Sequence, residues 1–268
     1  MNPDGEPKVK ATQTSLTILE EVMRRNGATL AELTADVDLS RSAVHNHLAT
    51  LEQNGLLVRE EGEYKPGMML LHMGVQARNR NPDYRIAKSS VDDLADETGL
   101  EVDFCIEEMG REFSLYSEVG TLGRADLQAG SVFYLHNNGT GKAILAEYSR
   151  ERVEEILDRW GLPAETENAI TTRERLFEEL ETVRERGYAT NEQELMAGYS
   201  AISMSCLYPD GDVFGALSIG GPTYRIEAER DELIERLSAA VEALEDEIAS
   251  SDADGESNWW KPFRMSDP

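Results

Sequence analysis

Hydrophobic side chains recur at helical spacing in the first quarter of the chain and predict three short helices. The first covers residues 14–25, where apolar positions fall three residues apart. The second begins at Thr29, which opens a T-x-x-E capping box. The third covers residues 41–54, with Ser40 as its N-cap.

A short hairpin is predicted directly after the third helix. Gly55 is suited to end that helix in the left-handed conformation. Residues 56–59 and 63–65 then form two strands around a Glu-Glu-Gly turn. Helix, helix, tight turn, helix and hairpin is the order of a winged helix-turn-helix. A linking helix is predicted over residues 68–80.

Beyond residue 100 the apolar pattern changes to the alternation of β-strands. Val102, Phe104 and Ile106 alternate with polar residues, and residues 201–207 and 213–219 flank a Pro-Asp-Gly turn. Five helices are predicted around these strands, over residues 82–99, from residue 139 onward, and over residues 149–160, 171–186 and 227–249. The helix over 171–186 is predicted to begin with a capping box from Thr171 to Glu174. The fold class is therefore α+β. We divide the chain into a flexible tail (1–10), a winged helix-turn-helix domain (11–67), a linking helix (68–81), a larger domain of strands and helices (82–249) and an acidic, poorly ordered tail (250–268).

The outward side of the third predicted helix carries small or hydrogen-bonding residues. A helix that enters the major groove needs such groups to reach base edges, and Asn and Gln are suited to adenine. The alternative is a solvated amphipathic helix of an unrelated domain. The ordered cap, glycine and hairpin favour the first interpretation. The candidate base contacts are Ser42, His45, Asn46, Ala49 and Gln53, and the candidate phosphate contacts are Arg41, Arg59 and Lys65.

The net charge of −26 is the unusual feature of the composition. Residues 1–80 carry only −2 of it and residues 81–268 carry −24, so only the first part is suited to approach a phosphate backbone. The chain has only six Lys against 20 Arg. This scarcity of lysine, together with the excess of acidic residues, resembles the composition of proteins from salt-accumulating haloarchaea. We expect the folded state to need high salt, which screens the repulsion between acids.

The remaining composition narrows the class of protein. No long apolar run or signal sequence is present, so we expect a cytoplasmic protein without a membrane partner. Cys105 and Cys206 lie in apolar stretches and are expected to be buried thiols. No histidine has metal-ligand spacing, and we expect no metal and no cofactor. His136 and Cys206 are the only candidate catalytic groups, and nothing pairs with them, so an enzyme is disfavoured.

Four stretches of the chain resemble the IclR family of transcriptional regulators. They are LSRSAVHNHLATLEQNGLL (39–57), YKPG (64–67), LHNNGTGKAILA (135–146) and ELMAGYSAISMSCLYPDGDVFGALSIGGPTYR (194–225). The resemblance implies that residues 11–67 are a DNA-binding domain and that residues 82–249 are an effector-binding and oligomerisation domain. The second domain would have a GAF-like fold, in which helices flank a curved antiparallel sheet that holds a ligand pocket. It also implies homodimers or homotetramers on palindromic double-stranded DNA operators.

The resemblance also implies a set of effector-binding positions. Where the family's oxo-acid pockets have an acid, a cysteine and a second serine, this chain has Asn191, Ala201 and Gly220, and Tyr199 is bulkier than the usual aliphatic residue. The matching positions are Leu122, Ala125, Phe133, Gly139, Thr140, Asn191, Tyr199, Ala201, Ser218 and Gly220.

The residues near 139 favour a small organic acid as the effector. Gly139-Thr140-Gly141 would present backbone N–H groups at a helix N-terminus, which suits a carboxylate. The alternative is that these glycines only form tight turns. The chain is thus predicted to be a DNA-binding transcription regulator that an organic acid controls. The alternative function is a DNA-binding architectural or regulatory oligomer with no small-molecule effector.

Overall fold

The computed structural model describes residues 9–37, 39–120 and 128–251. The chain divides into two compact units, one that ends at Arg80 and one that begins at Asn81. They are called here the N-terminal unit and the C-terminal unit. Among the described residues, no helix combines the length and the apolar character needed to cross a membrane.

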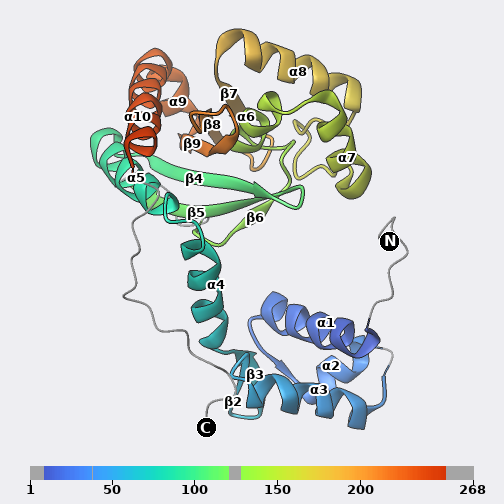
Figure 1. Cartoon of the computed structure of the whole chain (residues 1–268). Helices are drawn as coiled ribbons and strands as arrows, with labels where there is room; N and C mark the ends of the chain where they lie inside the picture. Colours follow the sequence, from blue (N-terminus) through green and yellow to red (C-terminus); the bar gives the residue numbers. More distant parts are fainter. Residues whose placement is uncertain (1–8, 38, 121–127, 252–268) are drawn as a thin grey trace. The chain divides into compact units, whose positions relative to one another are not determined.

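The N-terminal unit packs three of its four described helices beside a small antiparallel sheet (Figure 1). The strand order of this sheet is β1-β3-β2. Side chains from all three helices and the sheet form one buried cluster that includes Ile18, Leu33, Leu48 and Leu57. The elements are α1 (Lys10–Arg25), β1 (Ala28–Thr29), α2 (Leu30–Asp36), α3 (Arg41–Gln53), β2 (Leu57–Glu60), β3 (Glu63–Pro66) and α4 (Met69–Asn79).

The predicted helix ends and turns of this unit are present. Thr29 forms the capping box with Glu32, and the Ser40 side chain accepts a hydrogen bond from Ala43 N. Gly55 has φ +69°, and Leu56 N donates to Leu51 O, so α3 ends in a Schellman arrangement. The hairpin β2–β3 turns through two residues of positive φ. The prediction missed β1 and the first turn of α1, which starts at Lys10 rather than Thr14.

The C-terminal unit is built on an antiparallel sheet of six strands, in the order β6-β5-β4-β9-β8-β7. Its strands are β4 (Glu101–Glu108), β5 (Arg111–Val119), β6 (Val132–Phe133), β7 (Ala189–Glu192), β8 (Tyr199–Leu207) and β9 (Val213–Pro222). Its helices are α5 (Tyr84–Thr98), α6 (Gly139–Glu147), α7 (Arg150–Trp160), α8 (Arg173–Arg186), α9 (Thr223–Ala228) and α10 (Arg230–Ser250).

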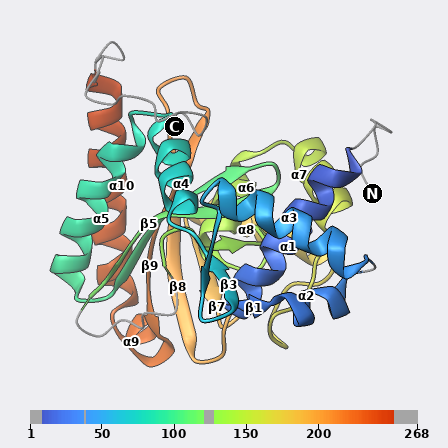
Figure 2. The same ribbon diagram turned by 90° about the horizontal axis from the view of Figure 1, so that it is seen from below.

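Helices cover both faces of this sheet (Figure 2). Val102, Phe104 and Ile106 of β4 point toward α5 and α10, with which they form the larger core. On the other face α6 lies against β8 and β9, and α7 and α8 pack outside it in a second core that includes Ile144 and Leu180. The polar side chains of β4 therefore face α6, inside the domain rather than toward water.

The predicted α+β fold, with an N-terminal winged helix-turn-helix and an antiparallel sheet flanked by helices, is confirmed. Three details were wrong. The N-cap of α8 is Thr172, whose side chain accepts from Arg175 N, and not Thr171. The final helix is interrupted near Glu229 and forms α9 and α10. The short strand β7 was not predicted, because four residues leave too little alternation to detect.

Candidate DNA-reading helix and effector cavity

Helix α3 presents a polar face that the rest of its unit leaves uncovered. Val44 and Leu48 are fully buried on one side of the helix, so the opposite side faces solvent. The six predicted contacts on this helix are all exposed, namely Arg41, Ser42, His45, Asn46, Ala49 and Gln53. A helix with one anchored face and one short, polar face has the form that major-groove recognition requires.

The two histidines of α3 lie in different surroundings. His45 is exposed, whereas His47 is half-buried with its Nδ1 2.8 Å from Ser15 Oγ of α1. That hydrogen bond fixes α3 against α1. His47 is thus part of the packing of the unit, and only His45 belongs to the outward face.

The wing carries more acid than base. Lys65 Nζ lies 3.1 Å from Glu60 Oε2, and this hydrogen bond, with the nearby Glu63 and Glu61, raises the pKa of Lys65. Arg59 is exposed, with its guanidinium 5.5 Å from the centre of the Tyr64 ring. A phosphate must therefore compete with Glu60 for Lys65, whereas the guanidinium group of Arg59 lies over the Tyr64 ring.

A cavity of about 30 Å³ opens between the sheet and α6 of the C-terminal unit. Seven predicted effector positions line it, namely Phe133, Gly139, Thr140, Asn191, Tyr199, Ala201 and Ser218. The cavity is also lined by five residues that were not predicted as effector positions, namely Asp103, Cys105, Glu112, Asn138 and Leu195. Predicted positions Leu122 and Ala125 lie outside the described residues.

Gly220, a predicted effector position, is not among the described residues that line the cavity. A Cβ at this position would collide with the hydroxyl of Tyr199, so the tyrosine occupies the space that a larger residue at 220 would fill. The departures from the family pattern at positions 199 and 220 therefore depend on each other, because the Tyr199 side chain needs the space that the absence of a side chain at 220 leaves.

The N-terminus of α6 is already occupied by the protein's own polar groups. Asn138 Oδ1 accepts from Gly141 N at 2.7 Å, and Thr140 Oγ1 donates to Glu112 Oε1 at 2.7 Å. A Cβ on Gly141 would collide with the carbonyl of Leu135, and one on Gly139 would collide with the Ser203 side chain. Both glycines thus serve close packing of the chain on itself. The carboxyl group at this helix N-terminus is that of Glu112.

Two buried carboxyl groups are the chemically distinctive part of the cavity. Asp103 on β4 is 8% exposed and Glu112 on β5 is 1% exposed. Burial raises the pKa of Asp103 to about 6 and that of Glu112 to about 7, although hydrogen bonds oppose both shifts. None of the described residues that line the cavity is a Lys, Arg or His. Both carboxyl groups therefore titrate near neutral pH without a cation in the wall.

The sequence pattern around Asp103 suggests the wrong environment for this side chain. In β4 acids alternate with apolar residues, a pattern typical of a strand with one solvated face. Here α6 covers that face, and the first six residues of β4 are all buried. A second helical layer cannot be inferred from the alternation itself.

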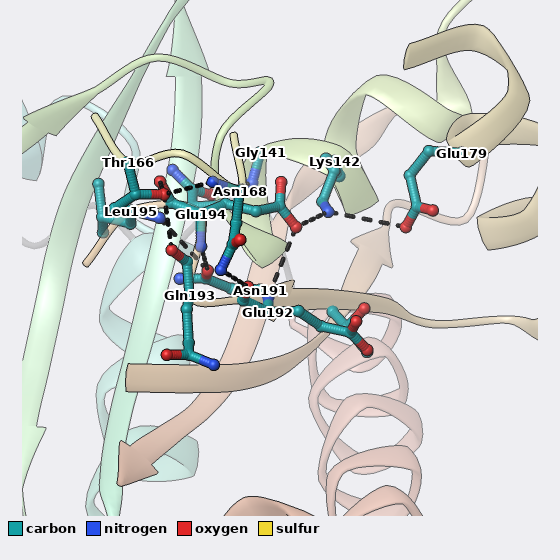
Figure 3. Close-up of polar contacts among 12 residues, drawn as sticks. Gly141, Lys142, Thr166, Asn168, Glu179, Asn191, Glu192, Gln193, Glu194 and Leu195 are labelled. Atoms are coloured by element: carbon teal, nitrogen blue, oxygen red, sulfur yellow. Dashed lines mark hydrogen bonds and ion pairs between the residues drawn. The ribbon is translucent and has the colours of Figure 1, made fainter. Parts of the chain in front are cut away.

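The loop between β7 and β8 is fastened over the cavity by a polar network (Figure 3). Asn191 Oδ1 accepts from Glu194 N at 2.9 Å, and Thr166 Oγ1 lies 2.8 Å from the Gln193 carbonyl oxygen. Lys142 is 1% exposed, and its Nζ lies 2.5 Å from Glu194 Oε1 and 3.6 Å from Glu179 Oε1. This network holds Leu195 in the cavity wall. It also engages the carbonyl oxygen of the Asn191 side chain, which leaves its amide group as the donor available to a ligand.

Comparison with known proteins accounts for both units. Residues 13–61 match the family model of the IclR helix-turn-helix domain, and residues 77–246 match that of the bacterial transcriptional regulator IclR C-terminal domain. The probable HTH-type transcriptional regulator ArcR of Halobacterium salinarum is 30% identical over 230 residues, which cover 84% of this chain and 88% of that protein. The transcriptional repressor IclR of Escherichia coli is 30% identical over 233 residues, with coverage of 83% and 84%.

Solved structures share the fold. An IclR transcriptional regulator from Alicyclobacillus acidocaldarius superposes with a TM-score of 0.75 at 23% identity, covering 90% of this chain and all of that one. A putative transcriptional regulator from Rhodococcus gives a TM-score of 0.77 at 19% identity, with coverage of 91% and 99%.

Proposed function

The chain belongs to the IclR family of transcriptional regulators, and from that premise we propose that α3 reads a palindromic DNA operator under the control of a small molecule bound in the C-terminal cavity. The observation that carries the proposal is the exposed polar face of α3, backed by fully buried apolar residues and followed by a wing. Asn46 and Gln53 contact base edges, and Arg41 and Arg59 contact phosphates.

The cavity favours a regulator that a small-molecule effector controls. It argues against the alternative function, a DNA-binding oligomer with no such effector. It lies inside a domain with two helical layers, and its wall includes a loop fastened by its own network of contacts. A ligand there shifts the equilibrium between two states of the domain by its difference in affinity for them.

A small organic acid is the effector class that the sequence favours. At the N-terminus of α6 its carboxylate would meet Glu112. Such an acid fits only when Glu112 is protonated, so its binding takes up a proton and weakens above about pH 7. The effector class is therefore testable by its pH dependence.

The proposal includes a homodimer or homotetramer on the operator. Two copies of α3 related by a two-fold axis read two half-sites, which makes the preferred operator palindromic. Light scattering of the chain in molar KCl, with and without operator DNA, gives the number of copies. A monomer on single half-sites would contradict this part.

The DNA-binding test is selection of operators from random DNA, followed by binding titrations in concentrated KCl. Asn46→Ala and Gln53→Ala should each weaken operator binding by about 1–3 kcal/mol and relax base preference at one position. Gln13→Ala, an exposed glutamine of α1, is the matched control and should leave affinity unchanged. Unaltered affinity in both α3 variants would refute the assignment of α3 as the reading helix.

A further inference from the structure

Among the residues that the structure describes, the lining of the cavity contains negative groups and hydrogen-bond acceptors but no cation. Asp103 and Glu112 belong to neighbouring strands, and their side chains both reach the cavity. Buried carboxylates are ordinarily paired, because an unpaired charge away from water is costly. Within the described part of the chain the wall supplies no such partner.

Glu112 has an unused acceptor. Its Oε1 accepts from Thr140 Oγ1, whereas Oε2 is buried and receives no hydrogen bond of good geometry, although the Cys105 thiol and the Asn138 amide lie near the carboxyl group. A buried polar atom without a partner is destabilising in the empty protein, and a ligand that donates a hydrogen bond to it removes that penalty. Glu112 is thus held in place by one oxygen and open to a donor at the other.

The size of the cavity limits the group that can enter. A volume of about 30 Å³ accommodates roughly two water molecules, or one group of ammonium size. Asn191 and Ser218 add neutral hydrogen-bonding groups, and Phe133 and Leu195 provide apolar contact for a short carbon chain.

We propose that this cavity binds the protonated amino group of an amine-bearing effector, held between the carboxylates of Asp103 and Glu112. This inference rests on the proposed function, because it names the chemical class of ligand for the same cavity. An ammonium group donates up to three hydrogen bonds and supplies the positive charge that the described lining residues lack.

The charge states of the surrounding groups are consistent with this ligand. At about pH 8 Asp103 and Glu112 are ionised, because their pKa values of about 6 and 7 lie below it. Burial raises the pKa of Cys105 and of Tyr199, so both stay neutral, and Glu101 adds a further acid beside Tyr199. Amine binding therefore strengthens from acid to mildly alkaline pH and releases protons near pH 6, whereas an organic acid shows the opposite dependence.

The experiment compares three probes that share one carbon skeleton: n-propylamine, β-alanine and propionate. Calorimetric titration of the full chain in concentrated KCl at about pH 8 should detect propylamine or β-alanine and not propionate. Glu112→Gln should weaken amine binding by about tenfold or more, because it removes a charge-assisted hydrogen bond. Glu178→Gln, on the exposed face of α8, is the matched control and should change nothing.

Each outcome bears on the proposal. Binding of propionate alone, binding of none of the three probes, or equal amine affinity in the Glu112→Gln chain would overturn it. Operator binding measured on the same preparations separates this result from the proposed function. If the chain binds operator DNA but no amine, only the ligand class is wrong. If it binds no DNA, the proposed function itself fails.

Discussion

Replacing Glu112 by glutamine tests whether a buried carboxyl group without a cation destabilises the folded C-terminal unit. The pKa of Glu112 is about 7 in the folded chain against an ordinary value of 4.5. The folded state therefore holds this proton more tightly than the unfolded state. The resulting stability is fully present below about pH 4.5 and is lost as the pH rises through 7. A difference of this size corresponds to about 3 kcal/mol at about pH 8.

Glutamine retains an oxygen for Thr140 and carries no charge, so Glu112→Gln should stabilise the chain by about 3 kcal/mol at about pH 8 and by less than about 1 kcal/mol at pH 5. For a unit of this size the melting temperature should rise by roughly 6–12 °C at the higher pH. Thermal unfolding of both chains across this pH range, at constant KCl, measures the difference. A melting-temperature difference that does not change with pH would refute the argument.

Three further predictions concern the loop, the cavity wall and the charge. Lys142→Met leaves Glu194 buried without its cation and should destabilise the C-terminal unit by about 3–5 kcal/mol; Lys142→Met with Glu194→Leu should recover most of this in thermal unfolding. Gly220→Ala should destabilise by about 1–3 kcal/mol through its collision with the hydroxyl and the ring of Tyr199; if Tyr199→Ala in the same chain does not relieve the loss, this collision is not the cause. The melting temperature should rise from dilute buffer to molar KCl, because salt screens the net charge of −26; a melting temperature that stays constant would contradict the repulsion argument.

The winged helix-turn-helix was predictable because its signals are local. The Thr29 capping box, the Ser40 cap and the Gly55 turn each lie within a few residues of the groups they bind. Local hydrogen bonds of this kind determine where a helix begins and ends whatever surrounds it. The helix-N-cap prediction failed only where two threonines, Thr171 and Thr172, stand side by side and both offer a cap.

The cavity was only partly predictable, since its chemistry depends on which strands become neighbours. The resemblance located the glycines and the hairpin, but it carried no information on Asp103 or Glu112. Asp103 and Glu112 belong to the hairpin β4–β5, and this hairpin is placed in the sheet by pairing of β4 with β9, more than a hundred residues further along the chain. The charge of a side chain is visible in the sequence, whereas its environment is set by such long-range contacts.

The two cysteines lie on opposite faces of one sheet. Their rates of chemical labelling can therefore report separately on the opening of each face in the native chain. Cys105 lines the cavity, while Cys206 belongs to the core beneath α5 and α10. Both thiols are buried, so a thiol-specific reagent reaches each only when its own layer opens. The rate of labelling at Cys105 therefore follows opening of the α6 layer, and the rate at Cys206 follows loss of the opposite layer. A molecule that fills the cavity should slow the first rate and leave the second unchanged, without any engineered label.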